Sequence, residues 1–290
     1  MKKKSNLFLY SGTFLLVIKT VFSASKIIPY SDFMDTILAA VGAFCMILSI
    51  IMQRYRVKVL LIYAMLIGIT VYNALITRNN ALAATVITCL AIRKTDIKTY
   101  IRYVFRMQSV LVICHTIIAI IGSMIGIFDI TQNIGGITRY DFGTLHPNSF
   151  AALVFNLIIM GIWLNWHKIK TKHIIYMILG SGILYCFCKT RTNFIAMLAV
   201  IGCVYVCRVK HKFVRLIGKI ATVIIPLLSV AMGTAIILYT TENRIVLLLN
   251  KVLNARITLG AYALAHEGFT LFGQNLTSLY TETTWDPIWK

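Results

Sequence analysis

Eight ionisable side chains stand in polar segments that separate or follow long apolar runs, and they could act on a charged substrate. They are Arg139, Asp141, His146, Lys189, Arg191, Arg256, His266 and Glu267. The guanidinium and ammonium groups could bind phosphate, and arginine does so through paired hydrogen bonds. The carboxyl and imidazole groups could transfer a proton at a reacting hydroxyl. The set therefore predicts a phosphate site with acid–base groups beside it.

Two of these segments lead directly into predicted helices. Pro147 suits a first helical turn because its missing N–H costs nothing there, and His146 precedes it. The segment from Lys189 to Asn193, which contains Arg191, leads into a second predicted helix, and its Thr and Asn residues can cap that helix. A helix N-terminus presents free N–H groups and the positive end of the helix dipole, which favours anions. Two plainer interpretations stay open: Lys189 and Arg191 could anchor the chain at lipid headgroups, and His146 could merely cap its helix.

Composition indicates a membrane protein. Of 290 residues, 59% are hydrophobic and only 13% are charged, whereas soluble domains carry about a quarter charged residues. The apolar residues fall in runs of roughly 15–26, enough to cross a hydrocarbon core of about 30 Å. The net charge of +20 does not indicate nucleic-acid binding, because the basic residues form small clusters between apolar runs.

We predict an all-α, polytopic integral membrane protein with about nine transmembrane helices. Residues 1–239 form the transmembrane domain, and residues 240–290 form an outer segment with a helix on the membrane surface. The first span resembles a secretory signal, but Lys19 interrupts it and we expect it to stay uncleaved. The break at 77–80 divides a run too long for one span. The predicted spans are 7–23, 33–52, 59–77, 79–92, 103–128, 149–166, 174–188, 193–207 and 220–239.

Charge distribution predicts the orientation. With the N-terminus inside, most basic residues fall in inner segments, as the positive-inside rule requires, and Asp96 is the only acid there. The other acids lie outside or at the outer rim, so acid–base chemistry is expected on the outer face. The inner basic clusters are 2–4, 54–58, 93–102, 168–172 and 208–219.

The outer tail contains an amphipathic stretch from Glu242 to Arg256. As a single helix it would align Asn243, Asn250 and Asn254 in one stripe, as in a helix lying on a membrane. Arg256 would lie off that stripe, which suggests a protein or phosphate partner. The seven cysteines all lie in apolar runs and are interpreted as small packing residues, so we predict no metal site among them.

Four motifs in this order resemble the superfamily of Wzy-type polysaccharide polymerases and O-antigen ligases, over residues from about 50 to the end. The ordered set on this topology carries the resemblance, because each motif alone is weak. The motifs are Phe-Gly-Thr-Leu-His-Pro-Asn at 142–148, Thr-Arg-Thr at 190–192, Asn-Ala-Arg at 254–256 and His-Glu-Gly-Phe-Thr-Leu-Phe-Gly-Gln-Asn at 266–275.

The resemblance implies glycan transfer at the outer leaflet of a bacterial inner membrane, without metal or cofactor. The substrate would be an oligosaccharide on a polyprenyl diphosphate, and other polysaccharide-assembly membrane proteins would be partners. Arg191 and Arg256, then Arg139 and Lys189, would bind the diphosphate. His146 or His266, and more weakly the carboxylates of Asp141 and Glu267, would act as the base. Members of that family usually continue into further spans, so a truncated chain is expected.

Other functions stay open. A ligase would move the same lipid-linked glycan to a different acceptor, and the sequence does not separate it from a polymerase. A transporter of lipid-linked sugars would place ionisable residues at mid-membrane, often between internal repeats. Here such residues are few (Lys19, Arg106 and His115) and no repeat is present, which disfavours transport. A non-catalytic assembly or sensor protein is the third alternative.

Overall fold

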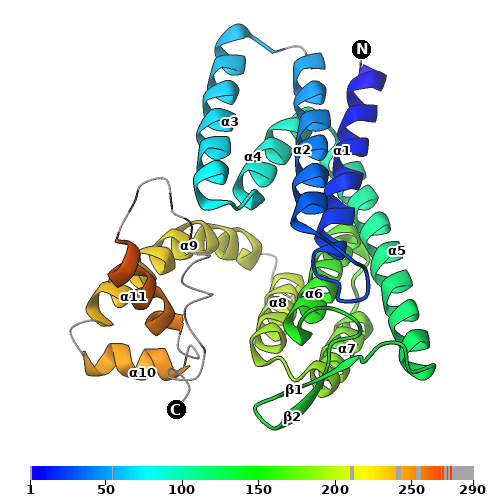
Figure 1. Cartoon of the computed structure of the whole chain (residues 1–290), viewed down its shortest axis with the longest axis vertical. Coiled ribbons are helices and arrows are strands. Elements are labelled where there is room, and N and C mark those ends of the chain that lie inside the picture. Colours follow the sequence, from blue (N-terminus) through cyan, green and yellow to red (C-terminus); the bar gives the residue numbers. More distant parts are fainter. Residues whose placement is uncertain are drawn as a thin grey trace. The chain divides into compact units, whose positions relative to one another are not determined.

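The computed structural model describes residues 2–53, 55–209, 212–239, 243–252 and 256–268, together with residues 270, 273 and 275. Over these residues the fold is mostly helical, with one short β-hairpin (Figure 1). The helices are α1 (Lys2–Phe22), α2 (Asp32–Met52), α3 (Val57–Thr77), α4 (Ala81–Ile92), α5 (Ile97–Met124), α6 (Pro147–Leu164), α7 (Thr171–Cys188), α8 (Arg191–Val209), α9 (Lys212–Tyr239), α10 (Arg244–Val252) and α11 (Arg256–Glu267), with a 3₁₀ turn η1 at Trp166–Lys168.

The chain divides into two compact units. Unit 1 comprises Met1–Ile67 and Ala84–Val209, and unit 2 comprises Gly68–Ala83 and Lys210–Lys290. Unit 1 therefore holds α1, α2, α5, α6, α7 and α8 with the hairpin, and unit 2 holds α9, α10 and α11. The predicted division at residue 239 separates α9 from α10, whereas the compact units divide the chain at the end of α8.

Eight of the described helices are long and apolar enough to cross a membrane. Each coincides with a predicted span, and the chain breaks at 78–80 as expected. The ninth predicted span became α4, which has 12 residues and reaches only about 18 Å at 1.5 Å per residue. That length is well short of the roughly 30 Å of a hydrocarbon core, so α4 does not qualify as a span by itself.

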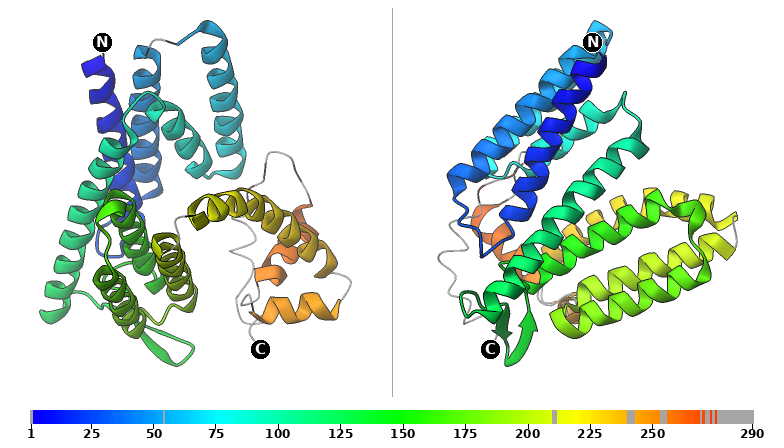
Figure 2. Two further views of the ribbon diagram at one scale, coloured as in Figure 1. Left: turned by 180° about the vertical axis from the view of Figure 1, so that it is seen from behind. Right: turned by 90° about the vertical axis from the view of Figure 1, so that its right-hand side faces the viewer.

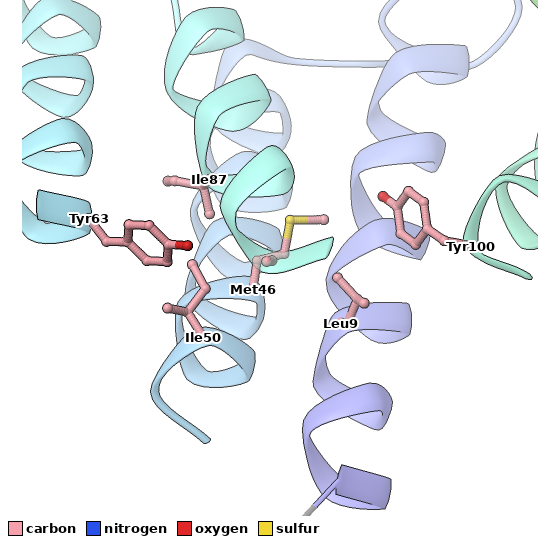
Figure 3. Close-up of a cluster of buried hydrophobic side chains, with 7 residues drawn as sticks. Leu9, Met46, Ile50, Tyr63, Ile87 and Tyr100 are labelled. Atoms are coloured by element: carbon pink, nitrogen blue, oxygen red, sulfur yellow. The ribbon is translucent and has the colours of Figure 1, made fainter. Parts of the chain in front are cut away.

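The apolar side chains divide into a small core and a large outer surface. Leu9, Met46, Tyr63 and Ile87 pack together with neighbouring residues, and Figure 3 shows these side chains pointing toward one another from α1, α2, α3 and α4. Many other large aliphatic residues face outward, such as Leu61, which is 65% exposed. A soluble protein rarely exposes so much contiguous apolar surface, and these helices suit lipid surroundings.

Helices α1 and α2 lie side by side in both views of Figure 2, and small residues let their backbones approach. A Cβ atom built on Gly12 would lie 2.6 Å from the carbonyl oxygen of Gly42 and 2.9 Å from Cγ of Met46. Polar side chains join the same helices, because the Ser5 hydroxyl donates to the carbonyl of Ser49 at 3.1 Å. The pair therefore depends on small residues at its crossing.

We expect Gly12→Ala to destabilise the protein by about 1–3 kcal/mol, because the new methyl group meets a backbone oxygen that cannot move aside. Gly68→Ala is the matched control, since a Cβ there meets nothing within 4 Å. Thermal unfolding of both variants in the same detergent measures the difference. Equal melting temperatures for the two variants would contradict this account of the crossing.

Helix ends that were predicted to share a side of the membrane contact each other in unit 1. The side-chain amide of Gln53 donates to the carbonyl of Ala91 at 2.9 Å. Gln53 directly follows the predicted span 33–52, and Ala91 lies at the predicted inner end of the span 79–92. The Arg208 guanidinium likewise donates to the carbonyl of Ile169 at 2.7 Å. The three predicted outer segments of unit 1 also meet each other, as described below.

The sequence analysis did not anticipate the β-hairpin between α5 and α6. Strands β1 (Thr131–Ile134) and β2 (Ile137–Tyr140) pair antiparallel, with Gln132 opposite Arg139. Gly135 and Gly136 form the turn, and both have positive φ, which glycine adopts without strain. Two glycines between β-forming residues are a hairpin signal, so this element was accessible from sequence.

The predicted single helix over 242–256 is wrong. Helix α10 ends at Val252 and α11 begins at Arg256, and their axes differ by 117°. The side chain of Asn250 reaches α11. Its Oδ1 accepts the backbone N–H groups of Ile257 and Thr258, both at 3.1 Å. Asn250 thus caps the N-terminus of α11, which is possible only because α10 and α11 are separate helices. Asn254 lies outside the described residues.

Candidate functional site

The polar segments that follow α1, α5 and α7 meet at one end of unit 1. Ser25 and Thr144 form an isolated β-bridge, and the N–H of Lys26 donates to the carbonyl of Gly143 at 2.9 Å. The last turn of α7 joins through aromatic packing, because the ring of Phe187 lies edge-on to that of Tyr140. The structure thus brings together five predicted site residues, namely Arg139, Asp141, His146, Lys189 and Arg191.

A buried ion pair fixes the loop before α6. Asp141 has no exposed surface, and the Lys26 ammonium lies 2.6 Å from its Oδ2. Its Oδ1 accepts the N–H of Gly143 at 2.8 Å, within a turn where Phe142 and Gly143 both have positive φ. Both carboxylate oxygens therefore have internal partners. This geometry gives Asp141 a positioning role, and the role of a substrate base predicted for it would need this pair to open.

Lys26 is a functional residue that the sequence analysis missed. It is the one charged residue between α1 and α2, in residues 23–31. Only the fold shows that it reaches Asp141, which is 115 residues away in the chain. The hydroxyl of Ser25 accepts the N–H groups of Ile27 and Ile28, so its hydrogen donates to Nε2 of His115 at 2.8 Å. His115 was one of the three ionisable residues considered for transport, and here it holds the same loop.

His146 is the N-cap of α6, as one of the two sequence interpretations predicted. Its Nδ1 accepts the N–H of Asn148 at 3.1 Å, so Nδ1 carries no hydrogen. The neutral ring must then carry its proton on Nε2, where it is a hydrogen-bond donor and not a base. Burial, followed by the nearby charge of Arg139, lowers the pKa of His146, and the Asp141 charge opposes this shift. His146 is therefore neutral at pH 7 and offers an N–H beside the α6 N-terminus.

Arg139 lies on β2 and has an unmet hydrogen-bonding group. Its Nε is enclosed and has no hydrogen-bond partner among the described residues. Buried donors in folded proteins are almost always paired, so such a donor is a place where an anionic ligand would gain most. The charge of Arg139 lowers the pKa of His146, so the two side chains lie close to each other.

The N-termini of α6 and α8 are joined by a hydrogen bond. The Asn193 side-chain amide, in the first turn of α8, donates to the carbonyl of Asn148, in the first turn of α6, at 3.2 Å. Lys189 ends α7 in a left-handed conformation with φ 50°, and Arg191 is the first residue of α8. Both side chains are exposed. Two positive helix ends and two exposed cations thus share one surface.

The other predicted residues, Arg256, His266 and Glu267, belong to unit 2. Arg256 opens α11 and is exposed. Nδ1 of His266 donates to the carbonyl of Tyr262 at 2.9 Å, because a carbonyl only accepts, and its ring packs 4.0 Å from that of Tyr262. The neutral His266 ring therefore has a free acceptor at Nε2, which is the tautomer a general base needs. Glu267 ends α11, and its side chain lies outside the described part of the chain.

His146 and His266 therefore suit different chemical roles. His146 is a donor at a helix N-terminus, and exposed His266 can accept a proton, so His266 is the better candidate for a base. Among the described residues, no three His, Cys, Asp or Glu side chains are grouped as metal ligands. Comparison with protein-family models, with curated proteins and with solved structures found no match to this chain.

Proposed function

We propose that this protein is a glycosyl-transfer enzyme of the bacterial inner membrane that polymerises oligosaccharide units carried on polyprenyl diphosphate. Its N-terminus lies in the cytoplasm, and the surface made by Arg139, His146, Lys189 and Arg191 faces the outer leaflet. One observation supports the proposal: the N-termini of α6 and α8 are joined by a hydrogen bond and have these donors around them, an arrangement that favours an anion.

In the proposed reaction, an acceptor hydroxyl attacks the anomeric carbon of the donor sugar. A new glycosidic C–O bond forms, the bond to the diphosphate oxygen breaks, and the anomeric configuration inverts. The leaving diphosphate gains negative charge at the bridging oxygen, which Arg191, Arg139 and the Nε2–H of His146 stabilise. The hydroxyl proton passes to a base. For that role His266 stays a prediction from the sequence, as Arg256 does for a further ligand of the diphosphate.

The three alternative functions differ in what they require of the structure. A transporter would use His115 as a mid-membrane polar group. His115 instead forms a hydrogen bond with Ser25, in the segment after α1. A ligase would use the same anion site and differ in its acceptor, so the two enzymes are separated by their products. A non-catalytic assembly protein would need none of the donors around the α6 and α8 N-termini.

The test is deletion of the gene in its host, followed by extraction of lipid-linked sugars and surface polymer. We expect single lipid-linked repeat units to accumulate and long polymer to disappear, because the step that joins the units is lost. Full-length polymer left unattached would indicate the ligase instead. Unchanged lipid intermediates and unchanged polymer would rule out both enzymes.

Substitution of His146 can separate its role as the N-cap of α6 from its role as a hydrogen-bond donor to the substrate. His146→Asn keeps an acceptor for the cap and an N–H donor, whereas His146→Asp keeps a strong cap but cannot donate. Both variants should insert and fold like the wild type. We expect His146→Asp to lose about tenfold to a hundredfold of activity, since one donor to a developing anion is removed and a negative charge is added. Chain extension in membrane vesicles measures this, and equal activity of the two variants would reduce His146 to a cap.

A further inference from the structure

A second feature of unit 1, distinct from the proposed active surface, is a groove between α6, η1 and α7. It has a volume of about 410 Å³ and is open on one side. Its walls are mainly apolar, with Ile158, Ile162, Ile169 and Met177 among them. Ile162 and Ile169 also belong to a buried cluster with residues of α8, so the floor of the groove is part of the packed core. The shape and lining suit a hydrocarbon chain.

Hydrogen bonds fix the polar rim of this groove. The Arg208 guanidinium holds the carbonyl of Ile169 at 2.7 Å, and the side-chain amide of Asn165 donates to the carbonyl of Gly161 at 3.0 Å. Nδ1 of His173 accepts the N–H of Lys170 at 2.9 Å, which leaves Nε2 as the N–H donor of the neutral ring. The rim is therefore built before any ligand arrives, which reduces the entropy cost of binding.

The charge at the rim has one sign. Lys168 and His173 line the groove, and Lys170 and Lys172 stand beside them on the same short connection. The connection and the helix turns on either side of it contain no acidic residue, from residue 158 to residue 177. An exposed ammonium and an imidazole N–H at the mouth of an apolar groove complement a phosphate diester that carries acyl chains.

We propose that this groove binds an anionic phospholipid, with one acyl chain along the apolar wall and the phosphate between Lys168 and His173. The occupant is a membrane lipid and not a soluble phosphate, because most of the lining is apolar and only the rim is polar. The groove lies at the C-terminal end of α6 and the start of α7, whereas the proposed active surface lies at the N-termini of α6 and α8, so the proposal does not depend on the enzymatic activity.

The experiment uses the full-length protein in detergent, titrated with short-chain phosphatidylglycerol while its thermal unfolding is followed. Phosphatidylcholine of the same chain length and inorganic phosphate are the comparison ligands. We expect phosphatidylglycerol to raise the melting temperature with saturation, and the other two to have little effect. An equal response to both lipids would show that the headgroup is not recognised, and a response to inorganic phosphate alone would assign a simple anion site. Either result overturns the proposal.

Matched variants locate the site. Lys168→Ala should weaken the apparent affinity for phosphatidylglycerol about fivefold, since one cation near a lipid phosphate contributes about that factor. Lys172→Ala removes the same charge four residues away and outside the groove, and it should change the affinity less than twofold. Equal losses would mean general surface attraction and would overturn the proposal.

The apolar wall has its own pair of variants. Ile158→Trp fills the groove and should weaken binding at least fivefold. Because Ile158 also packs against the buried cluster, the melting temperature of the lipid-free variant is measured first and each lipid response is taken relative to it. Ile159→Trp places the same bulk on a neighbouring exposed position that does not line the groove, and it should bind like the wild type. Full affinity in Ile158→Trp would exclude the groove as the acyl-chain site.

Discussion

Lys26→Met is expected to be among the most destabilising single substitutions in this protein, at about 3–5 kcal/mol. Methionine keeps the length of the lysine stem but leaves the Asp141 carboxylate without its counter-charge. Asp141 has no exposed surface, so water cannot replace the lost partner without opening the loop. Thermal unfolding in detergent measures the loss, and activity should fall with it because the same loop carries His146.

Substitution of the acidic partner, Asp141→Asn, should lower the stability less than Lys26→Met does. Asp141→Asn keeps an acceptor for the N–H of Gly143, and the Lys26 side chain, which is 25% exposed, can turn its charge toward water. The double variant Lys26→Met, Asp141→Asn should regain much of the stability lost by Lys26→Met alone, since no buried charge remains. A double variant that is no more stable than Lys26→Met would contradict the role assigned to this pair.

A second ion pair provides the control. Lys19 and Asp35 lie 2.9 Å apart, but their side chains are 19% and 27% exposed. Water can therefore solvate Asp35 when its partner is removed, and Tyr30 continues to donate a hydrogen bond to it. Lys19→Met should therefore lower the free energy of unfolding clearly less than Lys26→Met, because removing one partner of a partly exposed ion pair leaves a charge that water can reach.

The helices were predictable because membrane spans are a one-dimensional signal. A run of apolar residues of sufficient length must form a helix in lipid, whatever its neighbours are. The failures arose where length or three-dimensional contact decides. Helix α4 is too short to span by itself, and the turn between α10 and α11 depends on the side chain of Asn250 reaching α11.

The candidate site was predicted in part for a similar reason. His146 and Arg191 are recognisable because they stand at helix starts, and helix starts have local sequence signals. Lys26 has no such signal, and its importance depends on a contact with a residue far along the chain. The opposite tautomers of His146 and His266 were also inaccessible, because each is set by the hydrogen bond that the other ring nitrogen makes.

Arg191→Ala should reduce the proposed transfer reaction by about a hundredfold to a thousandfold, because an exposed guanidinium beside two helix N-termini is placed to stabilise a leaving diphosphate. Membrane vesicles from the deletion strain retain the accumulated lipid-linked units, so chain extension by a restored variant can be followed in them. Arg191→Lys keeps the charge but loses the bidentate geometry, and we expect intermediate activity. Arg78→Ala, at an exposed cation in the turn between α3 and α4, should leave activity unchanged. If Arg191→Ala reaches the wild-type membrane level and extends chains as fast as Arg78→Ala, Arg191 is only an interfacial anchor.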